Sequence, residues 1–294
     1  MTQGIIIKAL SGFYYIESDG VIYQTRARGV FRKRGQSPLV GDVVEFESSN
    51  LQEGTLTKIL PRKNAIVRPP VANVDVGIIV MSAVEPEFST HLVDRFLVYL
   101  EGLNVKPVIM ITKTDLLDVA GMSRLVDVKA RYEKIGYPVY FGQEVMKAPL
   151  LESLRGEKVI FLGQSGVGKS TLLNEMIPDL NQETGEISNA LGRGRHTTRH
   201  VSLHEIEGVW IADTPGFSTV DFMEIEKEDL PHLFPEFVEV EHECKFRECS
   251  HQHEPNCAVI QGVESADIRQ ERYDHYLNFY EELDQRKPVY KRKK

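Results

Sequence analysis

The stretch "EKVIFLGQSGVGKSTLLNEM", residues 157 to 176, runs from an apolar segment through a glycine-rich turn into a helical pattern. Its central part matches GxxxxGK[ST], the phosphate-binding loop, between a predicted strand and a predicted helix as that motif requires. Lys169 is expected to reach the β and γ oxygens of a nucleotide, and Ser170 to ligate Mg²⁺. The residues expected to hold the phosphates are Gly163, Gln164, Ser165, Gly166, Val167, Gly168, Lys169, Ser170 and Thr171.

Two further motifs belong to the same chemistry. In "TKTD", which begins at Thr112, Asp115 can accept two hydrogen bonds from the guanine edge and Lys113 can lie across the base ring. Adenine offers no such pair of donors, so the motif favours guanine over adenine. In "DTPG", residues 213 to 216, Asp213 can hold magnesium through water and the Gly216 N–H can contact the γ-phosphate.

The order of these motifs is unusual. Ordinary GTPases have the phosphate loop first and [NT]KxD last, whereas here "TKTD" precedes the loop by about fifty residues. A parallel sheet tolerates this order because its site is assembled at the carboxyl edge from strand positions, whatever the chain order. The sequence therefore predicts a circularly permuted P-loop GTPase domain.

Hydrophobic patterns give the extent of that domain. Continuous apolar runs at 76–84, 106–112 and 137–142 alternate with helical periodicity at 91–103 and 124–136. Strands buried on both faces imply a mainly parallel sheet covered by helices. We assign residues 71–221 to this α/β domain.

Residues 1–70 read instead as five short strands separated by turn residues, which predicts a small β-barrel. An oligonucleotide/oligosaccharide-binding (OB) fold is the first candidate and an SH3-like barrel the second. This segment carries a net charge of +4 within a chain of net charge −8. Its loop "TRARGVFRKRGQSP" places basic residues around Phe31, which we interpret as an RNA contact; the alternative is a solvated charged loop. The basic residues are Arg26, Arg28, Arg32, Lys33 and Arg34.

A Cys/His cluster marks the third segment, 222–294. Cys244, Cys249, His251 and Cys257 supply three thiolates and one imidazole, a set that suits a closed, structural zinc site; buried thiols are the alternative. His253 could replace His251 sterically. The segment is acidic and short of large apolar side chains, so we expect it to need the metal in order to fold.

Composition constrains the surroundings of the protein. The 294 residues contain no apolar run of the roughly 18 residues that a bilayer-spanning helix needs, and the N-terminal apolar run is short and interrupted by Lys8. The three cysteines cannot form a fully paired disulfide framework. We expect a cytoplasmic monomer with no membrane partner.

With the permuted order, the barrel, "GQSGVGKST", "GRGRHTTRH", "DTPGF" and the Cys/His cluster, the whole chain resembles the ribosome small subunit-dependent GTPase A family. The resemblance implies an OB-fold barrel, a permuted GTPase domain and a zinc-binding helical domain. It also implies a Mg²⁺-dependent GTPase that converts GTP to GDP, binds the small ribosomal subunit and its rRNA late in maturation, and is stimulated by that subunit. The family's CxH pattern favours His251 as the zinc ligand.

The resemblance also assigns catalytic residues. Phe217 stands where many GTPases have a water-orienting Gln, and the family's substitute matches His196, with His200 as a weaker candidate. Thr198 is expected to close on magnesium, with Thr197 as the second candidate. Thr112 replaces the usual Asn of NKxD and so lacks the amide that braces the phosphate loop.

Two other classes of function remain open at this point. A nucleotide-gated RNA-binding scaffold would need GTP binding but not turnover. A P-loop kinase or ATPase unrelated to ribosomes would also carry the phosphate loop, although "TKTD" and "DTPG" both disfavour it.

Overall fold

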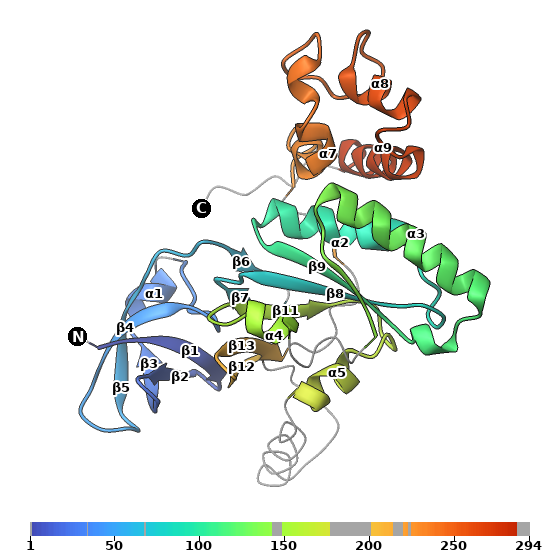
Figure 1. Cartoon of the computed structure of the whole chain (residues 1–294). Coiled ribbons are helices and arrows are strands. Elements are labelled where there is room, and N and C mark those ends of the chain that lie inside the picture. The colour runs from blue at the N-terminus through green and yellow to red at the C-terminus, as the bar shows by residue number, and fades with distance from the viewer. Residues whose placement is uncertain are drawn as a thin grey trace.

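The computed structural model describes residues 2–33, 35–67, 69–142, 149–176, 201–213, 220–222 and 225–286. Figure 1 shows a β-barrel at the N-terminus, a central sheet flanked by helices, and a helical module at the C-terminal end of the chain that sits on the helices of one face. Among the described residues, no helix combines the length and the apolar character that crossing a membrane requires.

Five strands form the barrel: β1 (Thr2–Leu10), β2 (Phe13–Ser18), β3 (Val21–Ala27), β4 (Val43–Ser48) and β5 (Gly54–Ile59). They pair in the order β1-β2-β3-β5-β4, and β4 pairs back with β1, so the sheet closes on itself. The β3–β5 pair is parallel and the other four pairs are antiparallel. This closed five-stranded barrel confirms the OB-fold prediction.

The loop after β3 differs from its predicted role. It contains the short helix α1 (Gly29–Lys33), and the Phe31 side chain is only 5% exposed because it packs into the hydrophobic core. The Phe31 ring is therefore not available to the RNA contact that the sequence suggested for this loop. The Phe13 ring does meet a cation, because the Arg26 guanidinium lies 4.4 Å from its centroid.

The central sheet has the order β10-β9-β8-β11-β13-β12. Its strands are β8 (Val76–Ser82), β9 (Lys106–Thr112), β10 (Val139–Phe141), β11 (Lys158–Leu162), β12 (Ser202–Ile206) and β13 (Val209–Asp213). Every neighbouring pair is parallel except β12–β13. The mainly parallel sheet is confirmed, with β8 and β9 beside the later strand β11, as the circular permutation requires.

Helices cover both faces of this sheet. On one face lie α2 (Thr90–Gly102) and α3 (Val119–Ile135), and on the other lie α4 (Pro149–Ser153) and α5 (Lys169–Met176) (Figure 1). Side chains of β8 alternate between two cores: Ile79 packs with Phe96 and Leu100 of α2, whereas Ile78 belongs to the core with Leu154 and Leu172. Full burial on both faces explains the continuous apolar runs of these strands.

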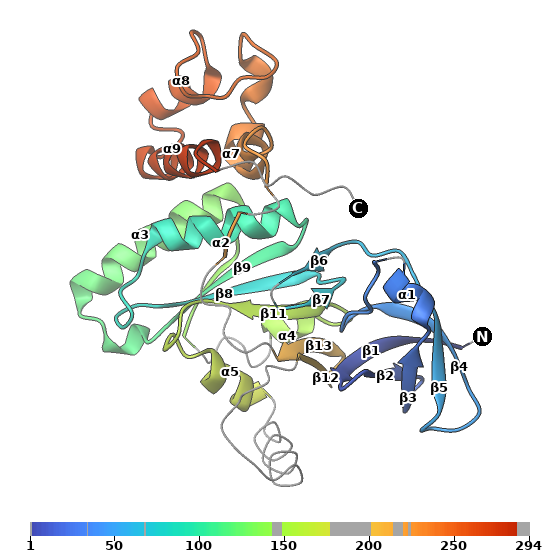
Figure 2. The ribbon, with the colours of Figure 1, turned by 180° about the vertical axis from the view of Figure 1, so that it is seen from behind.

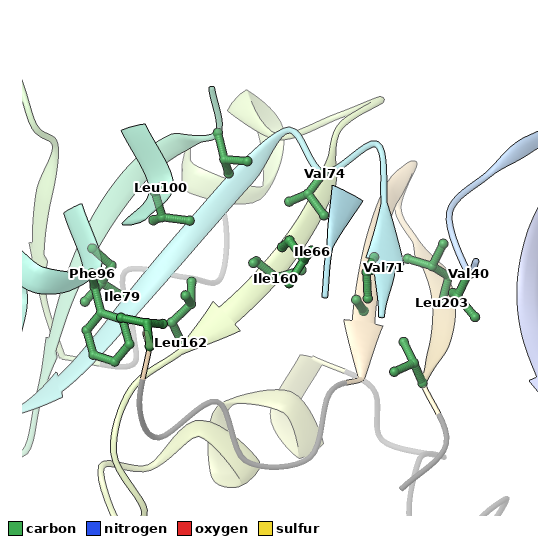
Figure 3. Close-up of a cluster of buried hydrophobic side chains, with 14 of the residues drawn as sticks. Val40, Ile66, Val71, Val74, Ile79, Phe96, Leu100, Ile160, Leu162 and Leu203 are labelled. Atoms are coloured by element: carbon green, nitrogen blue, oxygen red, sulfur yellow. The ribbon is translucent and has the colours of Figure 1, made fainter. Parts of the chain in front are cut away.

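The barrel and the sheet are joined, a feature that strand patterns did not predict. Strand β1 pairs with β12 at Lys8 and Ser202, so barrel and sheet form one 11-stranded sheet. The short strands β6 (Ala65–Ile66) and β7 (Val71–Ala72) lie at the junction (Figure 1). Figure 3 shows Val40, Val71 and Leu203 packed together there, in the same cluster as Ile79 and Phe96.

The C-terminal module contains η3 (Leu230–Leu233), α7 (Pro235–Val238), η4 (Glu241–Glu243), α8 (Ala258–Glu264) and α9 (Gln270–Asp284). Its core is aromatic, with Phe234, Phe237, Tyr276 and Phe279 all below 2% exposure. The expectation that this segment has too few large apolar side chains for a core of its own is wrong, because its aromatic residues converge. Val98 of α2 belongs to the same core, and α9 runs along α2 as seen from behind in Figure 2.

Candidate nucleotide site and metal centre

Four strands bring the predicted nucleotide motifs to one edge of the sheet. Strands β8 and β9 end together at the aligned pair Ser82 and Thr112, and the parallel strands β11 and β13 end at Leu162 and Asp213. The segments that continue from these ends carry "TKTD", the phosphate loop and "DTPG". The carboxyl edge of a parallel sheet is the position at which such folds bind ligands.

The phosphate loop needs glycine at its first conserved position. Gly163 has φ +143°, and a Cβ there would lie 2.1 Å from the Val80 carbonyl oxygen, so no other residue fits. The loop then leads into α5, whose first turn has backbone N–H groups without intrahelical partners. The Lys169 Nζ donates to the carbonyl oxygens of Gly163 and Gln164, both at 2.5 Å, and burial lowers its pKa.

The base-reading segment is bound directly to this loop. The buried Thr112 Oγ1 lies 2.7 Å from the Val167 carbonyl oxygen and 3.1 Å from that of Met81. A hydroxyl has one proton, so it donates to one of these oxygens at a time, and the shorter distance favours Val167. Thr112 lacks the amide of the usual Asn, as the sequence indicates, but its hydroxyl contacts the phosphate loop instead.

Lys113 and Asp115 follow in a tight turn. Lys113 adopts the left-handed conformation (φ 56°) and precedes the short helix η1 (Thr114–Leu116), in which Asp115 is exposed. The Lys113 ammonium donates to the Glu85 carbonyl oxygen, in the loop after β8. The ring of Pro86 in that loop lies near Gly166 of the phosphate loop. Base-reading and phosphate-binding segments thus share one neighbour, residues 83–89.

Asp213 ends β13 opposite Ser202 of β12, and it is half-buried. Burial raises its pKa, and the charge of nearby His204 opposes that shift. Ser170 is exposed at the start of α5. Together, Ser170 and Asp213 offer oxygen ligands of the kind that Mg²⁺ prefers. The other predicted residues, His196, Thr197, Thr198, His200 and Gly216, lie outside the described residues.

The Cys/His cluster converges as a metal site would. The ligand atoms of Cys244, Cys249, His251 and Cys257 all lie within 4.8 Å of one another. His251 Nδ1 is 3.3 Å from Cys257 Sγ and 3.7 Å from Cys244 Sγ, and those two sulfurs are 4.0 Å apart. Ligands of tetrahedral zinc are separated by about 3.5 to 3.8 Å, given Zn–S and Zn–N bonds near 2.3 and 2.0 Å. The donor set therefore fits zinc, whereas His253 is exposed and is not one of the residues whose ligand atoms converge.

The surroundings of the cluster fix its shape. The Ala258 N–H donates to Cys244 Sγ at 3.3 Å, and the Tyr273 hydroxyl donates to the His251 carbonyl oxygen at 2.7 Å. Burial raises the pKa of Cys249 to about 12, so only a cation would keep this thiol ionised at neutral pH. Burial lowers the pKa of His251, which keeps the imidazole neutral, as a metal ligand requires.

A polar network that sequence patterns missed holds the C-terminal module on α2. Asp94, which is 1% exposed, accepts hydrogen bonds from Arg272 Nη1 and from the Tyr132 hydroxyl (2.7 Å), and its other oxygen lies 2.6 Å from His275 Nδ1. Arg272 is also paired with Glu236 of α7. A buried aspartate on an apolar helix face was the one available signal. Two of its three partners, Arg272 and His275, are about 180 residues away in the sequence.

Comparisons with known proteins agree with this architecture. The family model described as RsgA GTPase matches residues 59–223, and the RsgA N-terminal domain model matches residues 3–56. A third model, described as 50S ribosome-binding GTPase, matches residues 158–289.

Relatives and solved structures extend over nearly the whole chain. An Enterococcus faecalis protein named small ribosomal subunit biogenesis GTPase RsgA is 53% identical, covering 99% of this chain and 98% of its own. A Streptococcus agalactiae protein of the same name is 51% identical with the same coverage. The crystal structure of YloQ, titled a circularly permuted GTPase, has a TM-score of 0.85 at 43% identity, covering 99% and 97%. YjeQ from Thermotoga maritima has a TM-score of 0.82 at 32% identity, covering 97% and 99%.

Proposed function

The chain is a GTP hydrolase that belongs to the RsgA family, and on that premise we propose that it binds the small ribosomal subunit and assists its late maturation. The observation that supports this most strongly is the match of curated relatives over 99% of the chain. The name of these relatives specifies the small subunit, whereas one matching family model is described as binding the 50S ribosome. We follow the relatives because they match barrel, GTPase fold and C-terminal module together.

For the nucleotide, we propose that Asp115 and Lys113 read the guanine base while Thr112 holds the phosphate loop against them. When GTP binds, the Lys169 ammonium would exchange its hydrogen bonds to the loop carbonyls for hydrogen bonds to the β and γ oxygens. These charge-assisted hydrogen bonds are strong because the ammonium is half-buried. Mg²⁺ would supply charge neutralisation at these oxygens when held by Ser170, Asp213 and Thr198. The Gly216 N–H would contact the γ-phosphate.

For hydrolysis, we propose that His196 orients the attacking water, since Phe217 cannot. Replacement by alanine should leave GTP affinity intact and remove most of the subunit-stimulated turnover. Retained subunit-stimulated turnover in His196→Ala would contradict the catalytic role of His196. His200→Ala is the comparison variant, because His200 is the weaker candidate for the same role and lies four residues away; it should keep most of the stimulated turnover.

For rRNA, we propose that the outer face of β2 and β3 provides the contact. Arg26 is exposed and stacks over Phe13, and Arg28 pairs with Glu47 at 3.7 Å, with both side chains more than half exposed. Strands 2 and 3 of OB folds are a common nucleic-acid surface, and stacked aromatic and arginine side chains suit unpaired bases. The double variant Phe13→Ala/Arg26→Ala should lose stimulation, whereas Lys58→Ala elsewhere on the barrel should not.

We propose three structural units with boundaries near residues 70 and 221, a monomeric state and a cytoplasmic location. The experiment that tests the function is GTP turnover with no subunits, purified small subunits or purified large subunits. Stimulation by small subunits alone is expected. Equal stimulation by both, or stimulation by large subunits alone, would contradict the proposal.

A further inference from the structure

A buried serine ends strand β8 at the nucleotide edge of the sheet. The Ser82 side chain is 1% exposed, and Ser82 is aligned with Thr112 of β9. Its hydroxyl oxygen accepts the backbone N–H of Glu85 at 3.1 Å and that of Val84 at 3.3 Å. Serine hydroxyls that accept N–H groups two and three residues ahead fix the turn that follows them. Ser82 therefore determines the path of the chain as it leaves β8.

The turn that Ser82 fixes is attached to the base-reading segment at two points. The Ala83 N–H donates to the Thr112 carbonyl oxygen at 3.0 Å, which continues the pairing of β8 and β9 past the last strand residues. The Glu85 carbonyl oxygen accepts the Lys113 ammonium. Because Ser82 sets the position of this carbonyl, it also determines where the ammonium lies.

The Lys113 side chain depends on this one acceptor. Among the described residues, no carboxylate pairs with Lys113, and the Glu85 carbonyl oxygen is the acceptor of its ammonium. A lysine side chain has many rotamers, so ordering it only when a ligand binds would lower the affinity. The hydrogen bond to Glu85 orders the side chain beforehand and leaves its aliphatic part available to pack on a base ring.

The same turn also approaches the phosphate loop. A Cβ placed on Gly166 would lie 4.0 Å from Cδ of Pro86, the residue after Glu85. This contact offers a second route from Ser82 to the nucleotide, through Pro86 to the phosphates. The route through the Glu85 carbonyl is the stronger one, because a directed hydrogen bond fixes the position of an atom and a single van der Waals contact does not.

We propose that Ser82 is a positioning residue for guanine-nucleotide binding. Its hydroxyl holds the Glu85 carbonyl in place, and that carbonyl holds the Lys113 side chain in the orientation that packs on the base. Ser82 is too deeply buried to touch the nucleotide, so it acts through Lys113 alone. The inference rests on the proposed function, in which Lys113 lies across the guanine ring.

The first test measures GDP affinity and GTP turnover of the full chain without ribosomal subunits. Ser82→Ala should weaken GDP binding about fivefold and raise KM for GTP without changing kcat, because the residues at the phosphates are unaltered. Ser82→Thr keeps the hydroxyl and should bind GDP within about twofold of the parent. Ser18→Ala is the matched control, since Ser18 is 7% exposed in the barrel and donates to the Gln3 carbonyl oxygen at 2.6 Å. It should lower thermal stability as Ser82→Ala does and leave GDP affinity unchanged.

The second test is a double-mutant cycle with Lys113→Met, which keeps most of the aliphatic part and removes the ammonium. Because both substitutions remove the effect of one hydrogen bond, adding Ser82→Ala to Lys113→Met should weaken GDP binding by less than about twofold further. The exposed Lys113–Glu85 hydrogen bond is not part of a core, so Lys113→Met is expected to fold and to weaken binding by itself.

Three results would overturn the proposal. They are an unchanged GDP affinity in Ser82→Ala, equal losses of affinity in Ser82→Ala and Ser18→Ala, and losses that multiply in the double variant, which would indicate the route through Pro86. The parent is titrated with ADP in the same experiment. A parent that does not prefer GDP would mark failure of the proposed function, whereas a parent that prefers GDP beside an unaffected Ser82→Ala would mark failure of this inference alone.

Discussion

The Thr112 hydroxyl lies 2.7 Å from the carbonyl oxygen of Val167, a residue 55 positions later in the chain. This contact joins the end of β9 to the phosphate loop that follows β11, with β8 between the two strands. Base recognition and phosphate binding are therefore parts of one rigid edge, even though the permutation reverses their order in the sequence.

Replacing Thr112 by valine should weaken GDP and GTP binding about tenfold. The substitution keeps the shape of the side chain but leaves the Val167 carbonyl without its donor in a buried place, which costs about 1 to 2 kcal/mol. Thr112→Ser keeps the hydroxyl and should bind nearly as the parent does. Fluorescent-nucleotide titration measures the affinity of both variants. An unchanged nucleotide affinity in Thr112→Val would contradict the role of the Thr112 hydroxyl in bracing the phosphate loop.

Removal of the metal should affect the C-terminal module first. One zinc per chain is expected by elemental analysis, and chelation should make residues 225–286 sensitive to protease while the barrel and sheet stay resistant. Cys257→Ser should lose the metal, whereas His253→Ala should retain it because His253 is exposed. A module that stays equally resistant after chelation would show that its aromatic core folds without zinc.

Asp94→Ala should destabilise the chain by about 3 kcal/mol. It leaves the fully buried Arg272 with Glu236 alone, and breaking a buried ion pair by removing one partner is costly. Glu133→Ala, which removes an exposed pair with Lys129 on α3, should cost no more than about 0.5 kcal/mol. Urea unfolding measures the difference, and equal effects of the two variants would contradict this account of the interface.

Glu101→Gln should stabilise the protein slightly at pH 8, by up to about 1 kcal/mol because the carboxylate is only partly buried. The pKa of Glu101 is raised in the folded chain, so the native state binds its proton more tightly than the unfolded chain, whose pKa is near 4.5. Stability is therefore lost as pH rises from that value to the folded pKa. The two proteins should unfold alike below about pH 4, and a difference that persists there would be inconsistent with this origin.

Local motifs predicted the nucleotide edge and the metal cluster well, because each depends on residues close in sequence. Position 163 needs glycine because of its own backbone angle, and the four Cys/His ligands lie close together in the sequence. Both features could therefore be predicted before the fold was known. The barrel and the permuted, mainly parallel sheet were predicted from the periodicity of the apolar residues and from the order of the motifs. His251 was preferred over His253 through the family pattern, and burial agrees.

Local sequence patterns could not predict contacts between residues that are far apart in the sequence. Because Phe31 is surrounded by basic residues in the sequence, a position on the surface is expected. In the structure, helix α1 directs its side chain into the core. Asp94 reads as a polar position on α2, and only the docking of α9 gives it Arg272 and His275 as partners. The bridging of β1 to β12 likewise depends on where two units meet, which no local periodicity encodes.

The central claim is that segments in permuted order assemble a guanine-specific pocket around Asp115. Calorimetric titration of the parent chain and Asp115→Asn with GDP, XDP and ADP tests it most directly. The parent should bind GDP at least about 100-fold more tightly than XDP or ADP, and Asp115→Asn should lose GDP and gain XDP. Comparable binding of ADP by the parent, or undiminished GDP binding by Asp115→Asn, would contradict the account.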